Sequence, residues 1–128
     1  MKFGTSGLRG LATDLLGPLT ARYVGAFARL LLDSGAVRPG GRIFIGRDLR
    51  ESSAEISALC ASVLSEAGLN VVDCGELPTP ALAGFAWSNG AAALMVTGSH
   101  IPADRNGIKF FLPDAEIGKA EEAAMTAK

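Results

Sequence analysis

The chain has 128 residues, 48% of them hydrophobic, and a net charge of −1. This length suits one domain with one packed core. The lysines and arginines are scattered, so no basic stripe is available for a nucleic acid, and no run of about 18 apolar residues is available for a membrane span. We therefore expect neither partner. With no apolar leader, and with two cysteines in no metal-binding pattern, a reduced cytoplasmic protein is expected.

The first half of the chain predicts two helices and a strand after a compact N-terminal segment. Residues 1–13 are rich in glycine and are expected to fold compactly. Pro18 suits the first turn of a helix, and apolar residues recur at helical spacing until Gly35 ends it. Residues 42–46 are typical of a buried strand, and a second helix follows over 51–68.

The second half continues this alternation. Its predicted elements are a strand over 69–74, a helix over 78–88, a strand over 91–96, a polar loop over 97–106, a strand over 107–111 and a final helix over 116–127. Alternating apolar strands and helices predict a single α/β domain, a three-layer α/β/α sandwich with a mixed, mostly parallel sheet. In such sheets ligands bind outside the carboxyl ends of the strands.

Three unusual loops are expected at that edge of the sheet, over residues 47–50, 77–80 and 97–109. The third carries Ser99, the only histidine of the chain, His100, and then Lys109. Gly98 leaves room for a substrate beside the serine. A serine hydroxyl is a weak nucleophile until a base or a charge assists it, and phosphoserine carries nearly two negative charges. His100 and Lys109 are candidates to stabilise the charge on a transferring phosphoryl group.

Less specific interpretations of these residues stay open. A serine in a loop with glycine and proline is more often a turn residue that bonds its own backbone. Asn106-Gly107 predicts a hairpin turn by default, which is compatible with a functional loop. Arg47 and Asp48 follow a strand, and a structural ion pair between them is an alternative to a role in binding. For Asp48 we favour the structural role.

The third loop as a whole is more specific than its parts. Thr97-Gly98-Ser99-His100-Ile101-Pro102, followed by Asn106-Gly107-Ile108-Lys109, resembles the active-site serine loop of the α-D-phosphohexomutases, the family of phosphoglucomutase, phosphomannomutase and phosphoglucosamine mutase. The sequence departs from the family pattern at Ile101, where asparagine is usual, and we expect a change of local packing there. Further segments that are similar to family motifs, in the family's order, are residues 3–10, Gly46-Arg47-Asp48-Leu49-Arg50 with Ser52-Ser53, and Pro78-Thr79-Pro80.

The resemblance covers nearly all of the chain and implies that residues 1–128 are the first domain of a four-domain phosphosugar mutase. It implies that Ser99 carries a phosphoryl group between C1 and C6 of a hexose phosphate. His100 and Lys109 would act as general acid and base or stabilise charge. Arg9 would hold the reacting centre, its rival interpretation being a surface arginine that anchors the N-terminal segment. The residues that the resemblance places around the phosphate are Thr97, Gly98, Thr5, Ser6, Asn106 and Arg47.

A cofactor and partners are implied as well. Mg²⁺ would be held in part by the phosphate on Ser99, with its other oxygen ligands in a later domain, because the acidic loop of the family does not occur in this chain. A hexose phosphate is the expected substrate, a hexose 1,6-bisphosphate the expected activator, and the C-terminal domains of the same chain the expected partners. Because positioning supplies much of the rate in phosphoryl transfer, the chain alone is expected to lack turnover.

Other classes of function compete with this interpretation. A non-catalytic module that binds a phosphate or a sugar phosphate is the first alternative, and a structural or interaction domain is the second. A Ser-His hydrolase is disfavoured because the chain has no G-x-S-x-G elbow. A nucleotide-binding domain is disfavoured because Gly4, Gly7 and Gly10 lie too far before any predicted helix and no Walker motif occurs. The sequence leaves the sugar and the oligomeric state open.

Overall fold

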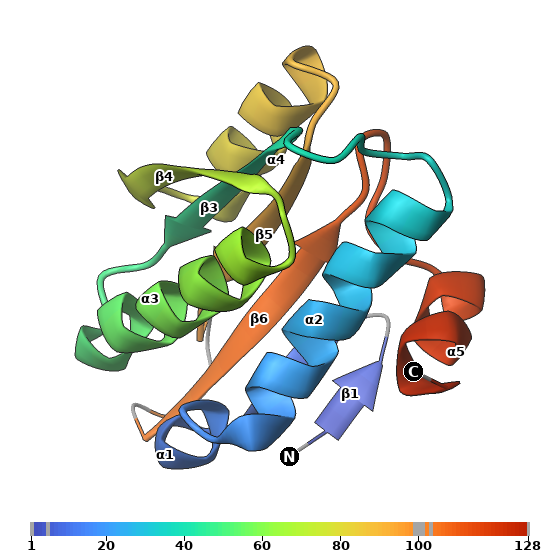
Figure 1. Cartoon of the computed structure of the whole chain (residues 1–128). Helices are drawn as coiled ribbons and strands as arrows, with labels where there is room; N and C mark the ends of the chain where they lie inside the picture. Colours follow the sequence, from blue (N-terminus) through green and yellow to red (C-terminus); the bar gives the residue numbers. More distant parts are fainter. Residues whose placement is uncertain (1, 5, 99–101, 103, 128) are drawn as a thin grey trace.

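The computed structural model describes residues 2–4, 6–98, 102 and 104–127. These residues form six strands and five helices, and the strands make one sheet in the order β1-β2-β6-β5-β3-β4. Helices cover both faces of the sheet (Figure 1). The predicted α/β class, the three layers and the mixed sheet are confirmed.

The N-terminal segment is a β-hairpin, which the sequence did not predict. β1 (Lys2–Gly4) pairs antiparallel with β2 (Gly7–Leu11), and β2 pairs antiparallel with β6 (Arg105–Phe111). The hairpin depends on Gly7, whose φ is +94°, a region that favours glycine. A Cβ at Gly7 would lie 2.0 Å from the carbonyl oxygen of Ile108, so the two strands approach too closely for any side chain there.

The other half of the sheet is mostly parallel. β3 (Arg42–Arg47) lies between β4 (Asn70–Glu76) and β5 (Ala92–Val96) and pairs parallel with both. β5 then pairs antiparallel with β6. The expectation of a mostly parallel sheet is therefore wrong, because the returning strand β6 and the N-terminal hairpin each add antiparallel pairings.

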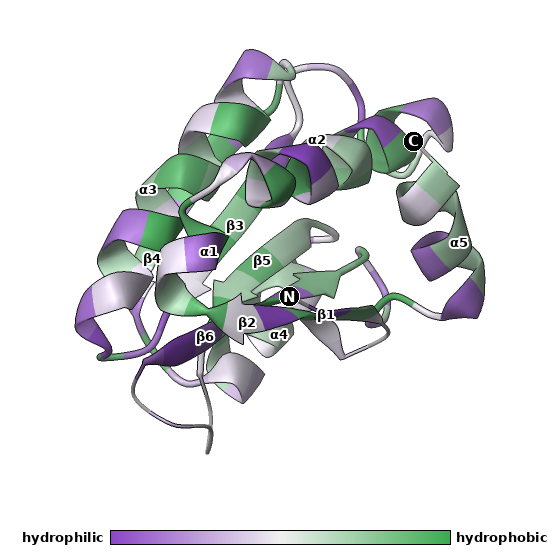
Figure 2. Ribbon diagram, turned by 90° about the horizontal axis from the view of Figure 1, so that it is seen from below, coloured by the Kyte–Doolittle hydropathy of each residue, from purple (hydrophilic) through white to green (hydrophobic). Residues whose placement is uncertain are grey.

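The helices divide unequally between the two faces. α1 (Ala12–Leu15), α2 (Pro18–Asp33), α3 (Glu51–Glu66) and α5 (Lys119–Ala127) pack on one face, and α4 (Thr79–Ser88) packs alone on the other. Figure 2 shows the layers, with α2 and α3 above the sheet and α4 below it. β5 is buried on both sides: Leu94 and Val96 belong to the larger core, whereas Ala93 and Met95 belong to the core under α4.

The sequence placed the long elements within a few residues. The final helix begins at Lys119 rather than at residue 116, because Glu116 forms an isolated bridge with Phe111. The hairpin turn expected at Asn106-Gly107 is wrong, since both residues lie inside β6 and pair with β2. Among the described residues, no helix is both long and apolar enough to cross a bilayer.

This topology brings several chain segments to one edge of the sheet. β5 ends at Val96 and β6 begins at Arg105, and the polar loop lies between them. β2 ends beside the start of β6, since Leu11 is the register partner of Arg105. β3 ends at the same edge, where the N–H of Asp48 donates to the carbonyl of Val96 at 2.9 Å.

Candidate active site

A hollow of about 170 Å³ opens where β2, β6 and the end of β5 meet. It is lined by Ser6, Arg9, Thr97, Gly98, Gly107, Ile108 and Lys109. Two of these lining residues are cationic and none is acidic. Because an anion is attracted by cations and by polar N–H and O–H groups, the lining suits a phosphate group.

The two cations reach the hollow because of the strand register. Arg9 on β2 lies opposite Gly107 on β6, and Lys109 on β6 lies opposite Met95 on β5. A Cβ at Gly107 would lie 3.1 Å from Cγ of Arg9 and 3.1 Å from the carbonyl oxygen of Thr97. Glycine at this position therefore lets the arginine side chain lie close to the end of β5.

The predicted phosphoryl carrier lies beyond what the structure describes. Ser99 and His100, and Thr5 of the N-terminal motif, are outside the described residues. The residues that precede Ser99 are placed: Thr97 is buried, and its N–H donates to the carbonyl of Gly107 at 2.9 Å. The hollow thus lies directly beside the point from which the chain continues to Ser99.

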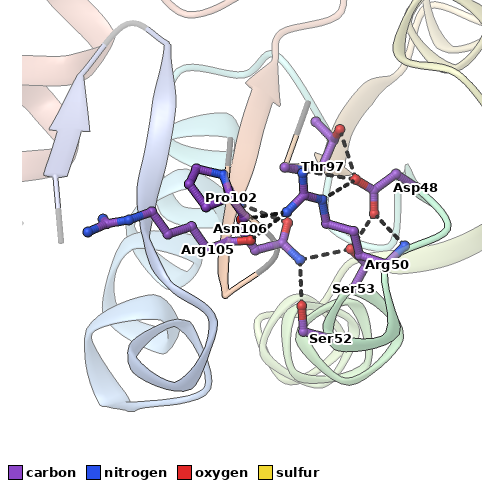
Figure 3. A network of polar contacts seen from close by, with 10 residues as sticks. Asp48, Arg50, Ser52, Ser53, Thr97, Pro102, Arg105 and Asn106 are labelled. Atoms are coloured by element: carbon purple, nitrogen blue, oxygen red, sulfur yellow. Dashed lines mark hydrogen bonds and ion pairs between the residues drawn. The ribbon is translucent and has the colours of Figure 1, made fainter. Parts of the chain in front are cut away.

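The carboxylate of Asp48 organises the start of the polar loop (Figure 3). Its Oδ2 accepts from the N–H of Gly98 at 2.8 Å and from Oγ1 of Thr97 at 3.2 Å. Its Oδ1 accepts from the hydroxyl of Ser53 and from the N–H of Arg50 at 3.1 Å. This carboxylate therefore ties the first turn of α3 to the end of β5.

The hydrogen bonds to the Asp48 carboxylate lower its pKa. Burial by itself would raise the pKa of the carboxyl, but the hydrogen bonds from Ser53, from the N–H groups of Gly98 and Arg50 and from Thr97 outweigh it, and the pKa lies below its ordinary value. Asp48 is thus held as an anion with its lone pairs in use. Its geometry is that of a structural residue, as favoured from the sequence.

Arg50 contacts the other end of the polar loop, and the sequence did not single it out as a site residue. Its Nη1 donates to the carbonyl of Pro102 at 2.8 Å and to that of Arg105 at 3.0 Å. Its Nε lies 3.5 Å from Oδ2 of Asp48. The sequence feature that could have identified Arg50 as a site residue is its position in the Gly46-Arg47-Asp48-Leu49-Arg50 motif.

Asn106 was expected among the phosphate-binding residues, but its side chain lies in the scaffold behind them. The residue is fully buried. Its Nδ2 donates to the hydroxyls of Ser52 at 2.9 Å and Ser53 at 2.8 Å, and its Oδ1 accepts from the N–H of Gly107 at 2.8 Å. Asn106 therefore fastens β6 to the first turn of α3, and it does not line the hollow.

Arg47, expected in the same group, also lies elsewhere. Its Nη1 is 3.4 Å from Oδ1 of Asp73, and the two side chains are 25% and 68% exposed. The ion pair considered between Arg47 and Asp48 is not formed, because Asp48 pairs with Arg50 instead. Arg47 lines a separate, larger groove with Leu49 and other residues of the 47–50 and 76–78 loops.

The comparisons with known proteins agree with the fold. The whole chain, residues 1–128, matches the family model described as phosphoglucomutase/phosphomannomutase, alpha/beta/alpha domain I. The chain belongs to this family. As the first domain of a phosphoglucomutase/phosphomannomutase, it has the α/β/α layers that the family description states.

Named relatives point in the same direction. A phosphomannomutase of Sinorhizobium fredii is 64% identical over 126 residues, which are 98% of this chain and 27% of the relative. A phosphoglucosamine mutase of Corynebacterium urealyticum is 41% identical, over 85% of this chain and 25% of the relative. A solved structure of a phosphoglucomutase/phosphomannomutase family protein from Burkholderia thailandensis has a TM-score of 0.78 and 31% identity, over 98% of this chain and 30% of that protein.

The chain thus spans about a quarter of the length of the curated relatives it matches. The relatives are named as mutases of different sugars, although they match the same region. This family domain is therefore shared among enzymes that differ in substrate.

Proposed function

We propose that this chain is the phosphoserine-bearing first domain of a phosphosugar mutase that moves a phosphoryl group between C1 and C6 of a hexose phosphate. Ser99 is the carrier. The observation that carries the proposal is the cationic hollow beside Gly98, which holds Arg9 and Lys109 next to the residue that precedes the serine.

The proposed reaction has two transfers. In the first, a free hydroxyl oxygen of the hexose phosphate forms a bond to the phosphorus on Ser99 and the bond from phosphorus to Oγ breaks. The hydroxyl proton passes to a base, and Oγ takes a proton from an acid. His100 and Lys109 are the candidate bases and acids. The bisphosphate then reorients, and its other phosphate returns to Ser99. Arg9 and Lys109 stabilise the charge on the phosphoryl oxygens during both transfers.

The described residues do not by themselves fit a magnesium ion. The lining of the hollow has cations and no carboxylate, and no group of three or more His, Cys, Asp or Glu side chains that could hold a metal occurs among the described residues. The oxygens of Asp48 are already bonded to Gly98, Ser53 and Thr97. The proposed Mg²⁺ would therefore be held by the phosphate on Ser99 and by oxygen ligands in further domains of the full-length protein.

The remaining parts of the activity are also proposals. Recognition of the sugar, binding of the distal phosphate and the remaining metal ligands would come from further domains of the same chain. A hexose 1,6-bisphosphate would load Ser99 and so activate the enzyme. The cytoplasm remains the predicted compartment.

Phosphopeptide mapping of the full-length protein tests the proposal. The protein is incubated with glucose 1,6-bisphosphate or mannose 1,6-bisphosphate and digested, and phosphate is located by mass spectrometry. We expect phosphate on Ser99, none in a Ser99→Ala variant, and wild-type loading in a Ser88→Ala variant. Ser88 is an exposed serine on α4 whose hydroxyl donates a hydrogen bond to the carbonyl of Gly84. Binding of hexose phosphates without any phosphate on Ser99 would instead support a non-catalytic binding module.

A further inference from the structure

Arg50 bridges two ends of the polar loop that are distant in sequence. It lies at the start of α3, more than fifty positions before the carbonyls of Pro102 and Arg105 to which its Nη1 donates. On its other side its Nε lies 3.5 Å from the carboxylate of Asp48, which in turn accepts from the N–H of Gly98. One side chain thus connects the entry and the exit of the segment that carries Ser99 (Figure 3).

Gly98 lies directly against this guanidinium group. A Cβ built on Gly98 would lie 2.2 Å from Cζ and 2.2 Å from Nε of Arg50. Gly98 does not have a left-handed backbone conformation, so the guanidinium, not backbone strain, excludes a side chain at this position. The sequence suggested that Gly98 leaves room for a substrate. The structure fills the space of its missing Cβ with Arg50.

The chemistry of these contacts requires an arginine. A planar guanidinium presents several N–H groups in fixed directions, so it can donate to two carbonyls, face a carboxylate and lie against a glycine at once. A lysine ammonium is a single compact charge at the end of a flexible stem and cannot keep this set of contacts. The Arg50 side chain is only 21% exposed, which limits its alternatives.

We propose that Arg50 is a positioning residue for phosphoryl transfer, acting through Gly98, Pro102 and Arg105 to set the distance between the two ends of the serine loop. This inference rests on the proposed function. For Ser99 to act as the proposed carrier, its phosphate has to reach Arg9 and Lys109, which line the hollow beside Gly98. In phosphoryl transfer much of the rate comes from such positioning, so a small displacement is costly.

Steady-state kinetics of full-length variants are the first test. In Arg50→Lys and Arg50→Met, kcat is expected to fall about 10- to 100-fold, while KM for the hexose phosphate changes less than about twofold. Arg42→Lys and Arg42→Met are matched controls, since Arg42 is an exposed arginine at the opposite end of β3 that lies over the ring of Phe44. If Arg50→Met folds poorly, the kinetics of the charge-conserving Arg50→Lys variant still test whether Arg50 positions the serine loop.

A double-mutant cycle provides a readout that a general loss of stability would not reproduce. Gly98→Ala alone is expected to lower kcat, because the new methyl group displaces the guanidinium. In an Arg50→Ala background the same substitution should cost little further activity, since nothing remains for the methyl group to displace. Strict additivity of the two effects would contradict a shared mechanism.

The outcomes separate this inference from the proposed function. Suppose that the wild-type protein is phosphorylated on Ser99 and turns over. An unaffected Arg50→Lys variant, or additive effects in the double-mutant cycle, would then overturn only the role proposed for Arg50 and leave the proposed function standing. A full-length wild-type protein that never accepts phosphate on Ser99 overturns both proposals. Loss of kcat at constant KM with strong non-additivity is the result that we expect.

Discussion

The two parts of the sheet contribute different kinds of residue to the site. The antiparallel part consists of β1, β2 and β6, and the parallel part consists of β3, β4 and β5. The antiparallel part supplies the cations Arg9 and Lys109, which line the hollow. The parallel part supplies Asp48 and Arg50, which follow β3 and hold the polar loop by hydrogen bonds. The proposed chemistry thus comes from β2 and β6, whereas the scaffold comes from residues that follow β3 and from Asn106 of β6. The two meet at the loop between β5 and β6.

This division has a physical reason. Successive side chains on a strand point to opposite faces, so the register of β2 and β6 fixes the face and the position from which the two cations extend. A loop has no ladder of its own, and its buried polar groups need partners from elsewhere. Asp48 and Arg50, which precede α3, supply those partners. Ser52 and Ser53 in the first turn of α3 bind the side chain of Asn106 on β6.

The largest expected effect concerns the chain as a whole. The 128-residue polypeptide by itself is expected to show no steady-state mutase turnover, because the proposed sugar-binding and metal-binding parts lie outside it. The measurement is conversion of hexose 1-phosphate to hexose 6-phosphate by the chain and by the full-length protein at equal concentration, after circular dichroism has shown that the chain is folded. Turnover by the folded chain alone would show that the cations of the hollow and the residues that hold the polar loop suffice for catalysis without further domains.

The next effect separates chemistry from scaffold. In the full-length protein, Lys109→Met and Arg9→Met are each expected to lower kcat about 10²- to 10³-fold, since each removes a cation that is proposed to stabilise transition-state charge. Their free energies of unfolding should change by less than about 0.5 kcal/mol, because Arg9 is exposed, Lys109 is half-buried, and neither belongs to the hydrophobic core. Kinetics and urea unfolding of the same preparations check this. A large loss of stability at normal activity would assign Arg9 the structural role considered from the sequence.

A smaller effect on stability tests the antiparallel part. Gly7→Ala is expected to destabilise the protein by at least about 2 kcal/mol, because it combines a positive φ with a Cβ that would lie 2.0 Å from the carbonyl oxygen of Ile108. Gly35→Ala is the matched control, with φ +77° and no atom within 4 Å of the added Cβ. We expect it to cost about 1 kcal/mol in urea unfolding. Equal costs at the two positions would mean that β2 can move away from β6.

The smallest effect concerns the scaffold and has a pH dependence. Asp48→Asn is expected to cost about 1–3 kcal/mol at neutral pH, because donors that face the carboxylate lose a partner. Since the pKa of Asp48 is lowered in the folded state, its stabilisation is present above the unfolded pKa of about 3.9 and is lost as the pH falls through the folded pKa. Urea unfolding between pH 7 and pH 3 should therefore show the two proteins converging in acid.

A matched control accompanies that experiment. Arg47→Ala breaks an exposed ion pair with Asp73 at the same end of the sheet and should cost less than about 0.5 kcal/mol at any of these pH values. If Arg47→Ala and Asp48→Asn behaved alike, the network around Asp48 would contribute no more than a surface ion pair.

Much of this molecule could be predicted from its sequence, and the failures have definite causes. The helices of α2 and α3 and the apolar strands β3 and β5 were predictable because hydrophobic periodicity and end signals are local. The hairpin of β1 and β2 was missed because its strands are short and rich in glycine, and they exist only through pairing with β6. Asn106-Gly107 was misassigned for the same reason, since its preference for a turn yields to pairing with Arg9 and Gly10.

By itself, the sequence determined the family, the layers of the fold and the motif that contains Ser99, because these depend on residue identity and short spacings. Only the tertiary structure decided what each residue near the motif does. Arg47 and Asn106 belong to the same motifs as Asp48 and Lys109, yet one pairs with Asp73 and the other is buried against α3. Strand order and register, which depend on contacts between distant segments, place Arg9 and Lys109 in the hollow and Arg50 across the loop.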